Sequence, residues 1–359
     1  MANDEKAIIN RRRAFLIETI KFDQLKGLEI GPLTAPLVTK EELNGRGEIF
    51  YLDHMPTDEL REKYADDPSV DVEKIIPVDF VCRDGNIVGA TSGNTFDYII
   101  ASHVIEHAPN LLQFLTEIER ILKPGGLCIL IIPDKRFTFD LNRPVTTFGC
   151  VLENFIGKQK MPNISAVYDH FATAVHANGH NLWHGIVNSK DAQLLVSSDF
   201  AWDAAHCVYD NQKYYDVHVN IFTPKSFFSI LKSAMEHEMI FFEVDKFGDT
   251  QIGQIEFMVA LKKPVNSEDK ASCIETFPEL NIENILSPYM PQVKSLSLAL
   301  ENATQLNVTL QKELEQLRIM KSAELDKLED QLSLAQKVLD RRAVRMLLFL
   351  IDRIFKVFR

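Results

Sequence analysis

The sequence has little of several features that define whole classes of proteins. Its five cysteines are scattered over 359 residues without a Cys-x-x-Cys pair, which argues against a disulfide framework and indicates free thiols in a reducing cytoplasm. No apolar run is long enough to span a bilayer. Basic residues are scarce, with 39 Lys and Arg against 51 Asp and Glu and a net charge of −12. This balance disfavours DNA or RNA as a partner, because phosphate contacts need clustered Lys and Arg.

What the sequence does contain is an alternation of strand-like and helix-like segments over residues 1–262. Stretches such as residues 111–122 repeat apolar residues every three or four positions, as an amphipathic helix does. Strands that alternate with helices predict an α/β fold with a doubly wound, parallel sheet and right-handed crossovers. The predicted strands cover residues 27–30, 48–52, 74–78, 96–101 and 127–132.

The alternation stops in residues 134–222, which are rich in His, Asn, Asp and aromatic side chains. We interpret this segment as a cap inserted into the sheet domain. Regular structure resumes at Thr223, which can cap a helix that has Pro224 in its first position. Residues 240–244 and 255–261 are then expected to close the sheet as a pair of strands.

The composition changes after the sheet domain. Residues 263–292 are polar, contain four prolines and lack periodicity, so we interpret them as a linker. Residues 293–340 show a heptad spacing of apolar residues with one stutter, which predicts an α-helical coiled coil and a homo-oligomer formed through residues 300–340. Asn307 at a seam position favours a specific register. A single amphipathic helix packed on the sheet domain is the alternative.

Residues 341–359 reverse the charge balance of the chain. Basic residues occupy one side of a helical wheel, and apolar residues such as Leu347, Ile351 and Phe355 occupy the other. A basic, strongly amphipathic helix is typical of a segment that lies in a membrane interface and attracts anionic lipid. We expect a cytoplasmic protein attached to the anionic inner face of the cytoplasmic membrane. Docking of this helix on a partner protein or on the protein's own oligomer is the alternative.

Residues that can contact a ligand stand at the ends of the predicted strands. Glu29, Gly31, Pro32 and Leu33 end the first strand and begin the turn after it, and Asp53 ends the second strand. Ligands of parallel α/β sheets bind beyond the carboxyl ends of the strands. These residues are therefore candidates for one common binding site.

The strand ends, the segment Phe96-Asp-Tyr-Ile-Ile-Ala-Ser-His-Val-Ile-Glu-His107 and the turn Lys123-Pro-Gly-Gly126 resemble the class I S-adenosylmethionine (SAM) dependent methyltransferases. The resemblance implies a seven-stranded, mostly parallel, Rossmann-like sheet and SAM as the cofactor. Residues 29–33 would then lie at the methionine end of SAM, and Asp53 would bind the ribose hydroxyls.

The same resemblance assigns four further residues to the cofactor. Asp79 would bind the adenine amino group and Phe80 would stack on the adenine ring, while Ser102 and His103 would border the methionine part. The chain departs from the family pattern at Leu33 and Ala35, where the family has glycine. This weakens a dinucleotide interpretation, because pyrophosphate demands those glycines, whereas SAM carries no phosphate.

Histidines are concentrated between residues 103 and 237. We consider a general base with substrate-binding partners, ordinary structural histidines, and a metal site of His with Asp; no residue is assigned to a metal. The cap residues resemble a narrower group, the methyltransferases of polysaccharide and glycan biosynthesis. A sugar hydroxyl has a high pKa and needs a base, for which histidine is suited. The candidates are His107, His170 and His218, with Asp134 as an orienting carboxylate or alternative base.

We therefore predict a SAM-dependent enzyme that methylates a sugar hydroxyl of a glycan, or of a lipid- or nucleotide-linked sugar, by in-line transfer. One alternative is a catalytically inactive, methyltransferase-like scaffold that recruits glycan-assembly enzymes through the coiled coil. A second alternative is a small-molecule methyltransferase. The coiled coil and the basic helix favour the first prediction, since glycan assembly takes place on lipid carriers.

Overall fold

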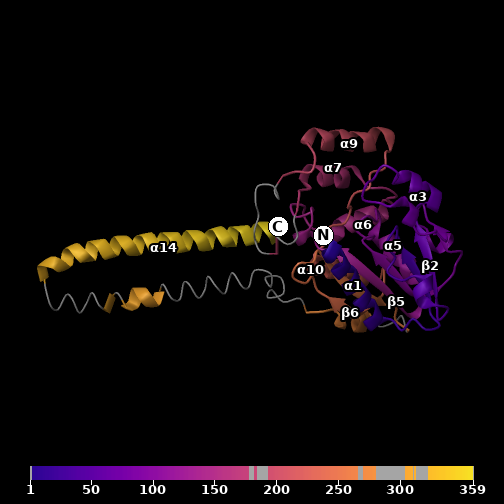
Figure 1. Ribbon diagram of the computed structural model, residues 1–359, viewed down its shortest axis with the longest axis horizontal. Helices are drawn as coiled ribbons and strands as arrows, with labels where there is room; N and C mark the ends of the chain where they lie inside the picture. Colours follow the sequence, from indigo (N-terminus) through magenta and orange to yellow (C-terminus); the bar gives the residue numbers. More distant parts are fainter. Residues whose placement is uncertain are drawn as a thin grey trace. The chain divides into compact units, whose positions relative to one another are not determined.

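The computed structural model describes residues 2–177, 182–183, 193–265, 270–279, 304–309, 311–312 and 322–358. The chain divides into two compact units, residues 1–280 and 281–359 (Figure 1). The first unit contains a seven-stranded sheet in the order β3-β2-β1-β4-β5-β7-β6. The pairs among β1 to β5 are parallel, and β7 is antiparallel to both β5 and β6. The predicted doubly wound, mostly parallel α/β sheet is confirmed.

The strands are β1 (Lys26–Ile30), β2 (Glu48–Asp53), β3 (Phe80–Val81), β4 (Phe96–Ser102), β5 (Leu122–Pro133), β6 (Glu243–Gly248) and β7 (Glu256–Lys262). The sheet is accompanied by α1 (Ala2–Thr19), α2 (Lys40–Leu43), α3 (Thr57–Lys63), α4 (Ile87–Ala90), α5 (Leu111–Ile121), α10 (Pro224–Glu236) and α11 (Lys270–Glu275). The cap contains α6 (Phe148–Ile156), α7 (Ile164–Thr173) and α9 (Ser198–Asn211), and short 3₁₀ turns are η1 (Val72–Lys74) and η2 (Lys135–Phe137).

Side chains alternate between the two faces of the central strands, as the two-residue period of a strand requires. In β5, Cys128 and Leu130 face the core formed with α5 and α10, whereas Ile129 and Ile131 face the core formed with α1. All four side chains are fully buried. A strand with two buried faces is apolar throughout, which is why β4 and β5 were recognisable in the sequence.

The prediction of a third strand at residues 74–78 is wrong. Lys74 belongs to the turn η1, which Asp71 caps, and the strand that pairs with β2 begins at Phe80, opposite Leu52. Ile76 instead donates a backbone hydrogen bond to the carbonyl of Leu33 in the turn after β1. The apolar segment therefore covers the turn after the first strand, and the sheet is extended by the two residues that follow.

The linker prediction for residues 263–292 is also wrong in part. Helix α11 lies in this range and packs on α10 and β6, with the Cys273 side chain 3% exposed in the main core. The Thr276 hydroxyl accepts a hydrogen bond from the backbone of Val244. These contacts make α11 part of the sheet unit. Residues 266–269 and 280–292 of the predicted linker lie outside the described residues.

In the second unit, helix α14 (Ser322–Phe358) runs without interruption across the predicted boundary between the coiled coil and the basic helix at residue 340. Most of the first half of the predicted heptad seam lies outside the described residues. Asn307 does have a partner, because its carbonyl accepts a hydrogen bond from the amide of Gln336 in α14. The coiled coil itself stays a prediction. Among the described helices, none is long and apolar enough to cross a membrane.

A buried carboxylate fixes the chain segment that follows β1. Glu29 is 1% exposed, and its two oxygens accept hydrogen bonds from the backbone of Leu37 at 2.8 Å and of Val38 at 3.2 Å. Burial raises the pKa of Glu29 to about 7, although the two hydrogen bonds act in the opposite direction. The side chain thus holds the β1–α2 connection in place and is not directed at a ligand.

This raised pKa predicts a specific pH dependence of stability. The folded protein binds the Glu29 proton more tightly than the unfolded chain, so this contribution to the free energy of unfolding is complete below pH 4.5 and is lost as the pH rises through about 7. Its full size is roughly 3 kcal/mol. In urea titrations at several pH values, Glu29→Gln should flatten the decline between pH 5 and 8, and the exposed control Glu62→Gln should keep it. An identical slope in Glu29→Gln would show that the carboxyl is already ionised in the folded state.

Candidate active site

The carboxyl ends of β1 and β4 lie side by side at the point where the strand order reverses. The turn after β1 has left-handed backbone at Gly31 (φ 65°) and again at Leu33 (φ 45°). A Cβ atom on Gly31 would lie 3.1 Å from a methyl group of Val104, so the close approach also favours glycine there. At Leu33 the side chain departs from the family pattern while the backbone keeps the conformation for which glycine is normally used. Pro32 joins the two positions.

Two polar groups lie at the ends of β2 and β4, the strands on either side of β1. Asp53, 7% exposed, ends β2; its Oδ1 accepts a hydrogen bond from the backbone of His54 at 2.7 Å and lies 2.6 Å from Nδ1 of the same residue. Its Oδ2 makes no hydrogen bond within the described part of the chain. The buried hydroxyl of Ser102, at the end of β4, also has no hydrogen-bond partner among the described residues. Buried polar groups usually have a hydrogen-bond partner, so both residues stay candidates for contact with a ligand.

Asp79 and Phe80 take positions other than those expected. Asp79 precedes β3, accepts a hydrogen bond from the backbone of Tyr51 at 2.9 Å and pairs with Lys40 at 3.3 Å. The ring of Phe80 packs with the rings of Phe50 and Phe96 in the core. Asp79 is therefore bound to β2 and α2, and Phe80 is part of the core. The acidic residue that follows β3 is Asp84. The sequence does not indicate it as the strand-end carboxylate, because the predicted strand at residues 74–78 ends before β3 begins.

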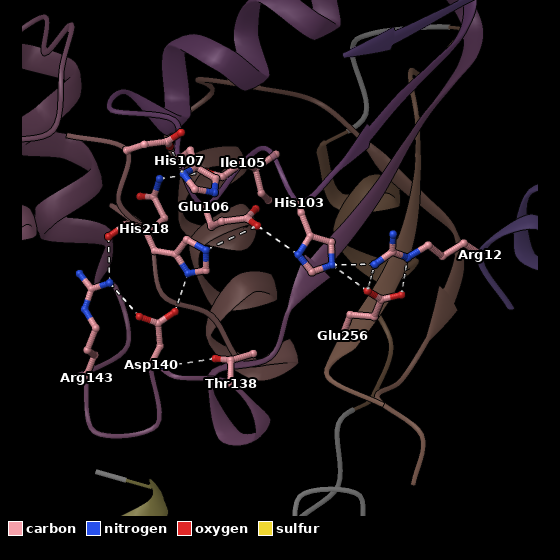
Figure 2. Close-up of polar contacts among 12 residues, drawn as sticks. Arg12, His103, Ile105, Glu106, His107, Thr138, Asp140, Arg143, His218 and Glu256 are labelled. Carbon is pink, nitrogen blue, oxygen red and sulfur yellow. Dashed lines mark hydrogen bonds and ion pairs between the residues drawn. The ribbon is translucent and has the colours of Figure 1, made fainter. Parts of the chain in front are cut away.

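His103 occupies a strained position at the end of β4. Its backbone is left-handed (φ 54°) and its N–H donates to the carbonyl of Ile131 at 2.9 Å. The side chain reaches across to β7, where Nε2 lies 2.7 Å from Oε2 of Glu256 (Figure 2). Arg12 of α1 binds the same carboxylate through two nitrogens, at 2.8 and 2.6 Å. Burial alone would raise the pKa of Glu256, but His103 and Arg12 lower it to about 2.

The three predicted catalytic histidines are brought together. The ring centroids of His107 and His218 are 4.8 Å apart, and those of His170 and His218 are 6.2 Å apart. They come from the loop after β4, from α7 and from the segment before α10. They are far apart in the sequence, and the fold of the cap brings them together.

Carboxylates hold two of these imidazoles. His218 Nδ1 lies 2.5 Å from Oδ2 of Asp140, and His107 Nδ1 lies 2.9 Å from Oδ1 of Asp216. Burial alone would lower the pKa of His107, but Asp216 and Glu106 raise it above its ordinary value. In return, contact with His107 holds the pKa of Asp216 well below its usual range.

His170 has a different environment. Its ring packs against Phe139 and Phe171, and its Nδ1 is buried without a hydrogen bond within the described residues. Burial lowers the pKa of His170 to about 4, with a further contribution from the positive charge of Arg143. At neutral pH this imidazole is uncharged and is a weak proton acceptor.

The prediction that Asp134 orients a histidine or acts as a base is corrected. Asp134 is fully buried and is held by Arg136, whose Nη2 lies 2.6 Å from Oδ2, and by the Thr250 hydroxyl at 2.8 Å. Asp140 is the carboxylate that orients His218, and Arg143 binds it at 2.9 Å. The spacing of Asp140 and Arg143, three residues apart, is a local signal for an ion pair. No local signal indicates the contact of Asp140 with His218, which lies 78 residues further along the chain.

Comparison with known proteins adds an independent observation. Residues 28–130 match the family model described as "Methyltransferase domain". Over this segment, which runs from β1 to β5, the chain is similar to methyltransferase domains. No curated protein has a significantly similar sequence.

Among solved structures, the CurJ carbon methyltransferase is 13% identical, with a TM-score of 0.30, 69% of this chain covered and 51% of the other. The DszA carbon methyltransferase is 15% identical, with a TM-score of 0.33 and coverage of 73% and 54%. A SAM-dependent methyltransferase from Methanosarcina mazei is 15% identical, with a TM-score of 0.35 and coverage of 70% and 98%. The chain spans about half the length of the first two structures.

The placement of the cofactor can be tested at Asp53. Its carboxylate would accept hydrogen bonds from both ribose hydroxyls, so Asp53→Ala should weaken SAM binding about tenfold or more. Isothermal titration of the full-length protein measures this effect, with the exposed Asp66→Ala as the control. Unchanged affinity in Asp53→Ala would place the ribose elsewhere.

Proposed function

We propose that the protein is a SAM-dependent O-methyltransferase whose acceptor is a sugar hydroxyl of a glycan or of a lipid- or nucleotide-linked sugar. The observation that carries the proposal is the pairing of two clustered histidines with carboxylates. They lie at the end of the sheet that also carries the turn after β1, residues 31–33, which we call the cofactor turn. The methyl group of SAM is already activated, so the protein has to align the acceptor and receive its proton. A hydroxyl acceptor needs such a proton acceptor because its pKa is high.

His107 is the group that we assign to receive the proton. Its side chain is 34% exposed, whereas the His218 side chain is 9% exposed. A general base has to reach the hydroxyl that it deprotonates, and His107 meets this condition. Asp216 stabilises the imidazolium that forms, and His218 packs edge-on against the His107 ring.

An aromatic groove in the cap supports a sugar as the acceptor. It has a volume of about 340 Å³ and is lined by Ile164 and Tyr168 of α7 and by Trp202, Ala205, His206 and Tyr209 of α9. Trp202 is 60% exposed and Tyr209 is 70% exposed. The lining is almost entirely apolar, so the groove offers aromatic ring faces on which the apolar face of a sugar ring can stack.

The proposal predicts a specific kinetic defect for His107→Gln. This variant should lower kcat by roughly a hundredfold, the usual effect of losing a general base, and should leave the Kd for SAM unchanged. The assay measures S-adenosylhomocysteine released with nucleotide sugars and lipid-linked oligosaccharides as acceptors. Trp202→Ala should instead raise KM for the acceptor. Methyl transfer to carbon or nitrogen acceptors alone, with none to hydroxyls, would contradict the proposal.

We also propose that α14 attaches the enzyme to an anionic membrane surface, where lipid-linked sugars are present. Within its own unit, Leu347 and Ile351 of the apolar side are 42% and 40% exposed, and Arg341, Arg342 and Arg345 are exposed as well. Exposed apolar and basic side chains on one helix are the combination that binds acidic lipid interfaces.

Vesicle co-sedimentation tests this attachment. The full-length protein should sediment with phosphatidylglycerol vesicles and not with phosphatidylcholine vesicles, and binding should weaken when salt is raised, because exposed charges are screened. Replacing Arg341, Arg342 and Arg345 with glutamine should abolish sedimentation. Equal binding to both kinds of vesicle, or none, would favour a protein partner for this helix.

A further inference from the structure

We propose that Glu106, His107 and His218 form a binding site for a divalent transition-metal ion. Each of the three side chains offers one ligand atom, and these atoms lie within 4.8 Å of one another. Two imidazoles and one carboxylate, with positions left for water or substrate, are the donor set of catalytic zinc and non-haem iron sites. The binding of the ion is independent of the proposed function, whereas its use in catalysis rests on that function.

The carboxylate of Glu106 is the strongest indication of a missing ligand. Glu106 is fully buried, and neither of its oxygens has a hydrogen bond within the described residues. Its nearest charged or titratable neighbours are His103 Nδ1 at 3.5 Å and His218 Nε2 at 4.0 Å (Figure 2). A buried carboxylate without hydrogen bonds is costly unless it is paired or coordinates a cation. A metal ion between Glu106 and the two imidazoles would satisfy it.

The surroundings of the two imidazoles match those of metal ligands. Nδ1 of His218 contacts Asp140, which leaves its Nε2, 4.0 Å from Oε1 of Glu106, for an ion. Nδ1 of His107 lies 2.9 Å from Oδ1 of Asp216 but makes no hydrogen bond within the described residues. A carboxylate on the second nitrogen is the usual support of a metal-bound histidine, because it fixes the ring and raises the basicity of the ligand. Arg143 in turn holds Asp140 from a buried position, through Nη1 at 2.9 Å from Oδ1.

Backbone contacts hold the two segments that carry the ligands against each other. The carbonyl of Glu106 accepts hydrogen bonds from the backbone of Val219 at 2.6 Å and of Asn220 at 2.9 Å. The Asn220 side chain also donates to the carbonyls of Ile105 and Ala108. The loop after β4 and the segment before α10 are therefore joined directly at the site. Ligand atoms about 2.1 Å from a tetrahedral ion lie about 3.4 Å apart. The three atoms here lie within 4.8 Å of one another, so side-chain movements that shorten the largest separation by about 1.4 Å would complete the site.

An ion here would change how the acceptor proton is lost. A hydroxyl bound to a divalent cation has a lowered pKa, so it could lose its proton to solvent water, and His107 would no longer have to receive that proton. The proton and the cation compete for the same ring nitrogens, and only one of them can be bound at a time.

Cobalt binding to the full-length protein, stripped of metal with a chelator, tests the inference. Co²⁺ is the probe because coordination by histidine gives visible absorption. We expect one Co²⁺ per chain, at least tenfold weaker binding in Glu106→Gln and His218→Ala, and weaker binding in Asp140→Asn, whose loss removes support from the ligand. His237→Ala, an exposed histidine outside the cluster, is the matched control and should bind Co²⁺ as the unaltered protein does.

Titration with SAM on each variant separates loss of the ion from loss of the fold. Absence of Co²⁺ binding in protein that binds SAM would overturn the inference, and so would undiminished binding in Glu106→Gln. Failure of methyl transfer to hydroxyls while the site still binds Co²⁺ would refute the proposed function and leave the metal site standing.

Discussion

Burial of negative charge at the carboxyl end of the sheet is the constraint on which this structure depends. Asp134, Asp140 and Glu256 are 0–2% exposed, and a buried carboxylate is tolerated only when it is paired and hydrogen-bonded. Each has its own arginine, from η2, from the cap and from α1 respectively. Asp140 also contacts His218, and Asp134 accepts a hydrogen bond from Thr250, so these carboxylates join segments that are far apart in the sequence. The pair of Glu256 with Arg12 joins β7 to α1 in the same way.

Local signals were sufficient to predict much of this fold. The apolar strands β4 and β5 are buried on both faces, and α10 begins with the predicted Thr223 cap and Pro224, with a capping box to Ser226. The third strand could not be placed in the same way. An apolar run such as residues 75–78 has the same pattern whether it pairs with a strand or covers a turn, and only the position of its neighbours decides between the two.

The candidate site was predictable in its residue types and less so in its pairings. The clustering of His107, His170 and His218 followed from a family resemblance, and the structure brings them together. Which carboxylate serves which histidine depends on the path of the cap, so Asp134 was chosen where Asp140 is the partner. Helix α11 was missed because six residues are too few to show a period. At Leu33 the sequence departs from the family pattern, but the backbone keeps the left-handed conformation for which glycine is normally used.

The ion pair between Arg12 and Glu256 joins residues 244 positions apart, and it sets an order of events during synthesis. Contacts between such distant residues form late, because a long loop has to close before they stabilise anything. Until β7 has been made, α1 lacks its anchor and β5 is an unpaired sheet edge, which invites association with other chains. A nascent chain that stalls before residue 256 therefore contains the whole turn after β1 and all three histidines of the cluster, and still has no closed domain in which to hold them.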